Sequence, residues 1–240
     1  MVEPLTQRKP RIRFTVNDYM TAPPGKRYQL LDGEMVPMDS PADSTSGQQS
    51  LLPESESMTR PKIKFTVNDY MTAPEDKRYQ LLDGEMILAP APTTRHQAIS
   101  IRLATALFQF VSQNNLGQVW TAPYDVVLSD YDVAQPDILF VSNQRAHLVT
   151  PANIQGAPDL VVEVLSPGTQ QYDRGYKRSL YARHGVREYW LVDPAAETVE
   201  VQAESDEGLT PVAAYGRGEI LISPLLPGLS IGLAGVFSGR

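Results

Sequence analysis

Two nearly identical segments lie close together at the start of this chain. Residues 10–35 and 61–86 align at a period of 51, and 22 of the 26 aligned positions are identical. Both copies contain FTVNDYMTAP and KRYQLLDGEM. Two copies are too few for a solenoid, which needs about three or more repeats to close a core. The near-identity therefore indicates a recent local duplication, or an upstream start that adds a partial copy. In either case fewer residues remain for one unique fold.

A polar stretch separates the two copies. Residues 37–60 are rich in Ser, Pro and acidic residues and contain no aromatic residue, a composition typical of a flexible linker. We expect a partial duplicate over 1–36 that copies 62–87, the linker over 37–60, and one folded domain over 61–240. A protein that began at Met58 would contain this whole domain.

The composition of the chain indicates its cellular compartment and the kinds of partner that it can bind. The 240 residues include no Cys, which excludes disulfides, thiolate metal sites and a cysteine nucleophile. The apolar runs are far shorter than the roughly 20 residues that span a bilayer, so we expect a cytoplasmic protein with no membrane partner. The net charge is -7, and residues 62–240, with 14 basic and 20 acidic groups, carry -6 of it. This charge weakens any non-specific attraction to nucleic acid.

The order of apolar, capping and turn residues predicts a mixed fold. Thr66 or Asn68 can cap a short helix through Met71, and Asp83-Gly84 between apolar segments is a strong hairpin signal. Longer helices are expected at about 95–115, capped by Thr93 or Thr94, and at about 170–184, ending at Gly185. Strands are expected at about 118–128, 137–141, 159–165, 188–193 and 198–202, with short strands and turns after them. This order favours an α/β (α+β) sheet flanked by helices.

Two acidic residues lie in or beside segments whose apolar pattern predicts buried strands. Glu163 interrupts the apolar run 159–165, where an ionised group costs several kcal/mol unless it is paired or bound to a metal. Asp137 follows Pro136 at the mouth of another apolar segment. Carboxylate oxygens of this kind are the ligands that Mg²⁺ prefers. The alternatives are a buried salt bridge for Glu163 and a turn role for Asp137.

The helix predicted over 170–184 adds a cation to this pair. Asp173 and Lys177 are four residues apart, with Tyr181 one turn further, so the three share one face. If that face covers the preceding strand, Lys177 approaches Glu163. The alternative is an exposed Asp–Lys pair that stabilises the helix by a few tenths of a kcal/mol.

Other charged residues near this helix are candidates for binding. The segment 173–187 carries five basic residues and one acid on an otherwise acidic chain, which makes it the candidate polyanion surface, although a solvated helix face has the same pattern. Its candidate nucleic-acid ligands are Arg174, Arg178 and Arg183. His96, at the start of the long helix, is either a cap-region residue or a site residue. Glycine-rich phosphate loops, G-x-S-x-G and zinc spacings are absent from the sequence.

These motifs, taken in order, resemble the Uma2 family (DUF820) of restriction-endonuclease-like proteins. The similarity covers most of residues 62–194. The segments that carry it are YQLLDGEM (79–86), Pro92 through His96-Gln97, PDILFV (136–141), PDLVVEVLSPGT (158–169) with Asp173 and Lys177, Tyr181, and HGVREYWLVDP (184–194). The family is similar to the PD-(D/E)XK nuclease superfamily, which implies a restriction-endonuclease-like mixed β-sheet core flanked by helices, with an N-terminal β-hairpin.

The resemblance also implies roles for individual residues. Asp137 matches the first acid of the superfamily motif and Glu163 the second. The superfamily lysine would fall on Leu165, which cannot serve, and the resemblance suggests that Lys177 on the following helix replaces it. His96 fits the histidine that the family has at the start of its long helix. Gln80 stands where these proteins often have Glu.

The function implied by these matches is Mg²⁺- or Mn²⁺-dependent hydrolysis of phosphodiester bonds in DNA by an endonuclease. Asp137, Glu163 and the backbone carbonyl of Val164 are the expected metal ligands. Lys177 would orient the nucleophile or offset charge on the phosphate. The expected supporting residues are His96, Asp173 and Tyr181. Resemblance to nucleases that act on duplex DNA also implies a homodimer.

Two other functions stay open at this point. The first is a catalytically inactive module that keeps the nuclease fold and binds nucleic acid or protein. The second is a carboxylate-pair hydrolase such as a glycosidase. Because Trp120 and Trp190 are the only tryptophans in the sequence, the chain offers little for stacking on a sugar.

Overall fold

A six-stranded sheet forms the centre of the protein in the computed structural model, which describes residues 28–31, 34–37, 64–73, 78–89 and 91–239. Its strands are β5 (Gly117–Thr121), β8 (Ile138–Ser142), β10 (Leu160–Val164), β11 (Glu188–Asp193), β12 (Thr198–Ser205) and β13 (Gly208–Gly216). They lie in the order β13-β12-β11-β10-β8-β5. Neighbouring strands are antiparallel except β10 and β11, which are parallel.

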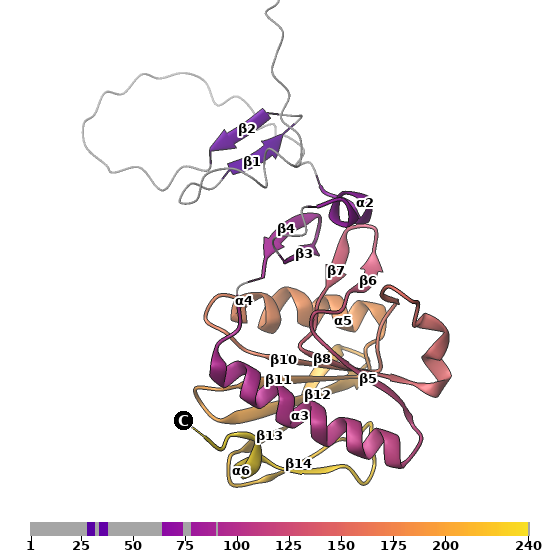
Figure 1. Ribbon diagram of the computed structural model, residues 1–240, viewed down its shortest axis with the longest axis vertical. Coiled ribbons are helices and arrows are strands. Elements are labelled where there is room, and N and C mark those ends of the chain that lie inside the picture. Colours follow the sequence, from indigo (N-terminus) through magenta and orange to yellow (C-terminus); the bar gives the residue numbers. More distant parts are fainter. Residues whose placement is uncertain (1–27, 32–33, 38–63, 74–77, 90, 240) are drawn as a thin grey trace, which may run out of the picture.

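Helices cover both faces of this sheet (Figure 1). One face packs against α3 (Thr94–Gln113) and the short α6 (Leu233–Val236). The other packs against a crossover helix that consists of α4 (Gln170–Tyr172), the π-helical η2 (Asp173–Lys177) and α5 (Arg178–His184). Parallel strands need such a crossover, so the crossover helix connects β10 to β11.

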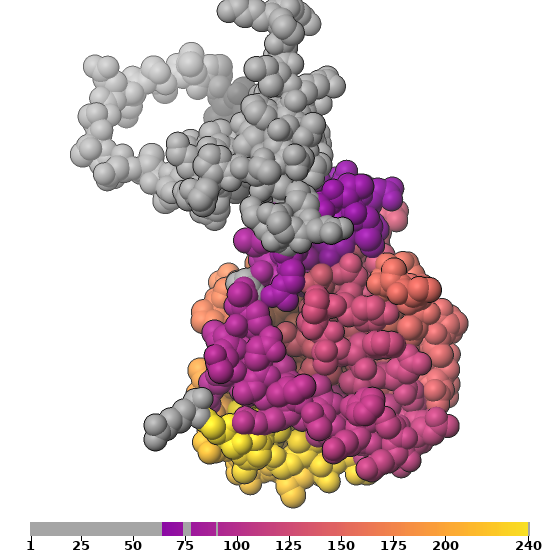
Figure 2. Space-filling view, in the orientation of Figure 1, coloured from indigo at the N-terminus to yellow at the C-terminus, as the bar shows by residue number. Residues whose placement is uncertain are grey.

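The alternation of side chains along β10 divides the core in two. Val162 and Val164 contact the α3 layer, whereas Val161 and the following Leu165 contact the layer of the crossover helix. Because successive side chains of a strand point to opposite faces, Glu163 points toward the crossover helix. The C-terminal segment, with β14 (Ile220–Ile222) and β15 (Ser230–Gly232), packs beside α3 and is yellow in Figure 2.

A second, five-stranded sheet has the order β4-β3-β7-β6-β9. Its strands are β3 (Tyr79–Leu82), β4 (Glu85–Leu88), β6 (Val126–Ser129), β7 (Asp132–Ala134) and β9 (Ile154–Gln155). The β3–β4 turn has positive φ at Asp83 (52°) and Gly84 (75°), as a two-residue hairpin turn requires. Helix α2 (Val67–Met71) precedes this hairpin and is capped by Thr66 in a capping box. The remaining described helix is the 3₁₀ helix η1 (Asn143–Leu148).

The described part of the N-terminal duplicate forms the same hairpin as the second copy. Strands β1 (Tyr28–Leu31) and β2 (Glu34–Pro37) pair antiparallel. Their register is that of β3 and β4 with every residue number lower by 51. The linker predicted over 37–60 lies outside the described residues except for Pro37. The division into three parts therefore stays a prediction.

Most predicted elements are present, with two corrections. The strand predicted at 118–128 is wrong: β5 ends at Thr121 and β6 begins at Val126 in the other sheet. Pro123 stands between them and lacks the N–H that a continuing ladder needs. The prediction of only short strands after residue 202 is also wrong, because β13 extends over nine residues. No helix within the described ranges is long and apolar enough to cross a membrane.

Candidate active site

A cavity of about 440 Å³ opens where the N-terminus of α3 meets β10 and the crossover helix. Four residues predicted for the site line it: His96, Asp137, Glu163 and Lys177. Val164, also predicted for the site, lines the same cavity. Asp173 and Tyr181 stand behind the wall, where they contact Lys177 and Glu163. The fold thus brings together the two acids and the lysine that the sequence separates by up to 40 residues.

The Glu163 carboxylate is held by two residues of the crossover helix. Its Oε1 accepts hydrogen bonds from Lys177 Nζ at 3.0 Å and from Tyr181 Oη at 2.8 Å. Lys177 Nζ also lies 3.0 Å from Asp173 Oδ1. All four side chains are buried. The prediction that Lys177 approaches Glu163 is therefore confirmed, and the exposed Asp–Lys pair is wrong.

A π-helical turn over Asp173–Lys177 interrupts the crossover helix at this point. Such turns are rare in proteins, and those that occur frequently lie at functional sites. Tyr189 Oη, from β11, donates to the carbonyl of Asp173 at 3.0 Å, so the sheet supports the irregular turn. The spacing of Asp173, Lys177 and Tyr181 predicted a regular helix here. Gly175 in the middle of the helix was the available signal.

The site carries an excess of negative charge. Burial raises the pKa of Glu163 above its ordinary value, and although Lys177 opposes this rise, the charges of Asp173 and Asp137 add to it. Burial lowers the pKa of Lys177, but Glu163 and Asp173 outweigh this effect and raise it. Lys177 is therefore held as a cation between two acids, and the remaining negative charge is of the kind that a divalent cation relieves.

Asp137 is positioned from two sides. Its Oδ2 accepts a hydrogen bond from Val164 N at 2.8 Å and lies 3.2 Å from His96 Nε2. His96 is in the first turn of α3, whose N-cap is Thr93. Burial lowers the pKa of His96, but the hydrogen bond and charge of Asp137 and the Val164 carbonyl outweigh it and raise the pKa. The structure therefore places His96 at the candidate site and not only at the helix cap.

The donor set fits a hard divalent cation. Within the described part of the chain, the hydrogen bonds of the two acids go to Asp137 Oδ2 and Glu163 Oε1, which leaves one oxygen on each. Among all residues that the structure describes, no group of three or more His, Asp or Glu side chains is suited to hold a metal ion. An ion held by two carboxylates and the Val164 carbonyl would complete its shell with water, as Mg²⁺ commonly does.

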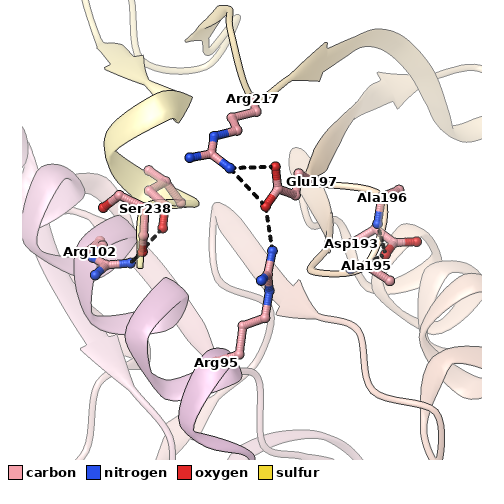
Figure 3. A network of polar contacts seen from close by, with 9 residues as sticks. Arg95, Arg102, Asp193, Ala195, Ala196, Glu197, Arg217 and Ser238 are labelled. Atoms are coloured by element: carbon pink, nitrogen blue, oxygen red, sulfur yellow. Dashed lines mark hydrogen bonds and ion pairs between the residues drawn. The ribbon is translucent and has the colours of Figure 1, made fainter. Parts of the chain in front are cut away.

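The cavity is also lined by residues that were not among the predicted site residues. Gln80, on β3, is buried, and its Oε1 accepts from Gln135 N at 3.2 Å. Arg95, beside His96 on α3, donates to Glu197 Oε1 at 2.6 Å (Figure 3). Arg217 holds Glu197 from the other side, at 3.1 Å. Gln80, Gln135 and Arg95 all line the cavity. The available signal for Arg95 was its position in the first turn of a capped helix beside His96.

The three arginines predicted to bind nucleic acid do not line this cavity. Arg174 Nη2 lies 3.3 Å from Asp193 Oδ2, at the rim. The other two pack against neighbouring elements: Arg178 donates to the carbonyl of Leu209, at 3.0 Å from Nε and 2.7 Å from Nη2, and Arg183 lies 5.8 Å from the centre of the Tyr176 ring. Their role in nucleic-acid binding stays a prediction.

A mixed sheet between helices is the architecture expected of a restriction-endonuclease-like fold, and in this chain two acids and a lysine line one cavity of it. The chain belongs to the Uma2 family, since the sequence model of that family, described as "Putative restriction endonuclease", matches residues 67–234. An uncharacterized protein of Synechocystis sp. is 26% identical over 156 residues, which cover 63% of this chain and 80% of that protein.

A solved structure from Anabaena variabilis shares the fold. It is described as a putative nuclease belonging to DUF820, and it superposes with a TM-score of 0.61 at 21% identity, over 72% of this chain and 97% of that one. The predicted family and fold class are therefore confirmed.

Proposed function

We propose that this protein is a divalent-metal-dependent endonuclease that hydrolyses phosphodiester bonds in DNA, with Mg²⁺ or Mn²⁺ as its cofactor. The observation that carries the proposal is the convergence of Asp137, Glu163 and Lys177 on one cavity. The comparisons support the proposal, because the chain belongs to a family described as a putative restriction endonuclease.

In this proposal the two acids and the Val164 carbonyl hold the metal ion. The ion, when bound, supplies an acidified water and a Lewis acid for the phosphate oxygens. Asp137 uses the oxygen that Val164 N and His96 leave unoccupied. Glu163 uses the oxygen opposite Lys177 and Tyr181. Each carboxylate is therefore positioned through one oxygen and offers the other.

Lys177 acts as a fixed cation. Because Glu163 and Asp173 raise its pKa, it stays protonated and does not serve as a general base. Its ammonium orients the attacking water or offsets the negative charge that builds up on the phosphate in the transition state. Tyr181 restricts the rotation of the Glu163 side chain through its hydrogen bond.

The DNA approaches from the side of the cavity formed by α3 in this proposal. Arg78 and Arg95 line that cavity, and the first turn of α3 adds the positive end of a helix dipole. Contacts of this kind are local, which suits a chain with a net charge of -7. Duplex DNA as substrate, a homodimer as the active form and a cytoplasmic location complete the proposal.

The direct test is a cleavage assay on supercoiled plasmid with Mg²⁺ or Mn²⁺ and with EDTA. We expect nicked and linear products only with the metal ion, and a loss of at least about 100-fold in Asp137→Ala and Glu163→Ala. Glu207→Ala, on the exposed turn between β12 and β13, is the matched control and keeps full activity. Thermal unfolding verifies that each variant is folded.

Two outcomes would contradict the proposal. The first is cleavage that survives in both acid variants, which would place the chemistry elsewhere. The second is metal-independent DNA binding without cleavage, unchanged in Glu163→Ala. That result favours the catalytically inactive binding module.

A further inference from the structure

The second copy of the duplicated segment is held on the domain by a small set of contacts with residues 125–135, which we call the seat. Tyr70 Oη donates to Asp125 Oδ1 at 2.8 Å and accepts from Gln135 Nε2 at 3.1 Å. Gln135 N donates to Gln80 Oε1 at 3.2 Å. These bonds place a tyrosine of α2 and a glutamine of β3 on the same two seat residues.

Backbone bonds and one apolar cluster complete the seat. Three backbone N–H groups of the segment bond to it: Val67 to Asp130 O at 2.8 Å, Gly84 to Tyr131 O at 2.9 Å, and Asp83 to Asp132 Oδ1 at 2.9 Å. Leu81, on β3, pairs with Val133 on β7, and both are fully buried in a cluster with Phe65. Leu82 and Ile87 also pack against the core cluster on the other side of the segment, and the Lys64 ammonium lies 5.7 Å from the centre of the Tyr131 ring.

Most of the contacting residues occur again in residues 13–37. The identical counterparts are Phe14, Val16, Tyr19, Gln29, Leu30, Leu31, Asp32 and Gly33. Within the 25 aligned residues the differing positions are 13, 24, 25, 36 and 37. Of these, Arg13 keeps the charge of Lys64, and Val36 keeps the β-branched apolar character of Ile87. Pro37 replaces Leu88, which is exposed at the end of an edge strand, where proline is tolerated.

We propose that residues 13–37 exchange with residues 64–88 on the seat of their own chain. The hairpin of the first copy already has the register that the seat requires. Docking in the same chain is favoured over docking in a neighbouring chain, because residues 37–60 have the composition of a flexible linker. Such a linker gives an effective concentration of about a millimolar, which exceeds the protein concentration in most solutions.

The length of the connection to α3 decides which copy predominates. Five residues separate Leu88 from Thr94, and 56 separate Pro37 from Thr94. The entropy of closing a flexible loop scales with the three-halves power of its length, which favours the second copy about 40-fold. The exchanged state is therefore a minor one, with a few per cent of the molecules.

The exchange keeps the chemistry of the cavity but changes its connection. Arg78 and Gln80, which line the cavity, have identical counterparts in the sequence, Arg27 and Gln29. The five-residue link from the hairpin to the helix that carries His96 is then replaced by a 56-residue connection.

Disulfide trapping tests the exchange directly, because the chain contains no native Cys. We would introduce Leu30→Cys with Val133→Cys in the full chain and follow oxidation on non-reducing gels. The reference pair is Leu81→Cys with Val133→Cys, which are partners across β3 and β7. The matched control is Leu31→Cys with Val133→Cys, because Leu82, the counterpart of Leu31, faces the opposite cluster.

The expected result is a disulfide within one chain for the Leu30→Cys pair, formed about 40-fold more slowly than in the reference pair and at a rate independent of protein concentration. The Leu31→Cys control stays reduced. The proposal is overturned if the Leu30→Cys pair forms no more disulfide than this control. It is also overturned if the disulfide joins two chains, because the occupant would then come from a neighbour.

A second measurement does not depend on cysteine chemistry. Leu81→Asp places a charge in the buried cluster and expels the second copy, so the first copy must take the seat. We expect the unfolding equilibrium constant of the full chain to rise about 40-fold. In the Leu30→Asp, Leu81→Asp double variant, this equilibrium constant is at least about 30-fold higher than in Leu81→Asp. Leu30→Asp alone leaves the equilibrium constant unchanged. Equal stability of Leu81→Asp and the double variant would overturn the proposal.

Discussion

At the scale of single residues, the site depends on a lysine enclosed by acids. Lys177 is 2% exposed and Glu163 4% exposed, so neither charge has enough water around it to be stable alone. Removing one partner of a buried ion pair leaves an uncompensated charge in the interior, which is far more costly than losing a pair at the surface.

We therefore predict that Lys177→Met lowers the free energy of unfolding by about 3–5 kcal/mol, measured by urea denaturation. Arg174→Met on the same helix is the control, because its ion pair with Asp193 is half exposed and contributes about 0–1 kcal/mol. Equal losses in the two variants would show that Lys177 does not stabilise the buried acids.

Glu188, remote from the site, is expected to make the stability of the protein depend on pH. Its Oε1 accepts from Trp190 Nε1 at 2.6 Å and its Oε2 from Leu225 N at 2.7 Å. Burial raises its pKa above the ordinary 4.5, against the opposing effect of these bonds. The folded state therefore binds the proton more tightly than the unfolded state, and the contribution of Glu188 to stability falls as pH rises above about 4.5.

Glu188→Gln isolates this contribution. We predict that the stability of the wild-type protein minus that of Glu188→Gln decreases between pH 4.5 and pH 7, as measured by urea unfolding at several pH values. A difference that stays constant or increases over this range would contradict the assignment.

At the scale of elements, the best predictions came from residues whose chemistry is local. Thr93 or Thr94 before an apolar stripe predicted the start of α3, whose cap is Thr93. Gly185, with φ of 85°, predicted the end of the crossover helix. The continuous apolar run around Glu163 predicted the buried strand β10. In each case a cap, a turn or a buried face determines the structure within a few residues.

The elements that were missed depend on contacts distant in sequence. The π turn at Asp173–Lys177 is stabilised by Tyr189 from another strand, and Gly175 in the middle of the helix is only a weak local signal for it. In the second sheet, the strands β6, β7 and β9 have only two to four residues, which is too short for a periodic signal. Nothing in the sequence predicted that Arg95 and Arg217 would meet at Glu197, since this contact joins α3 to the turn before β14.

The cap of α3 gives a prediction at this scale. Thr93 accepts a hydrogen bond from His96 N at 3.2 Å, so Thr93→Ala removes the cap and loosens the turn that holds His96 beside Asp137. We expect a loss of about 1 kcal/mol in stability, with Thr105→Ala, on the exposed side of the same helix, costing less. A Thr93→Ala variant as stable as the wild type would show that the cap bond contributes nothing.

At the scale of the whole molecule, the domain is expected to stand without its N-terminal duplicate. The second copy already occupies the seat, and the described core clusters contain no residue before Phe65. We predict that deleting residues 1–57 leaves a folded protein with a melting temperature within a few degrees of the full chain. An unfolded or aggregated truncation would show that the first copy is required for folding.

The central claim, a divalent-metal site between Asp137 and Glu163, is tested most directly by anomalous diffraction from crystals soaked in Mn²⁺. We predict an anomalous peak within coordination distance of both carboxylates and the Val164 carbonyl, and none in crystals of Glu163→Ala. Fully soaked crystals without a peak at this position, or with an equal peak in the Glu163→Ala variant, would contradict the claim.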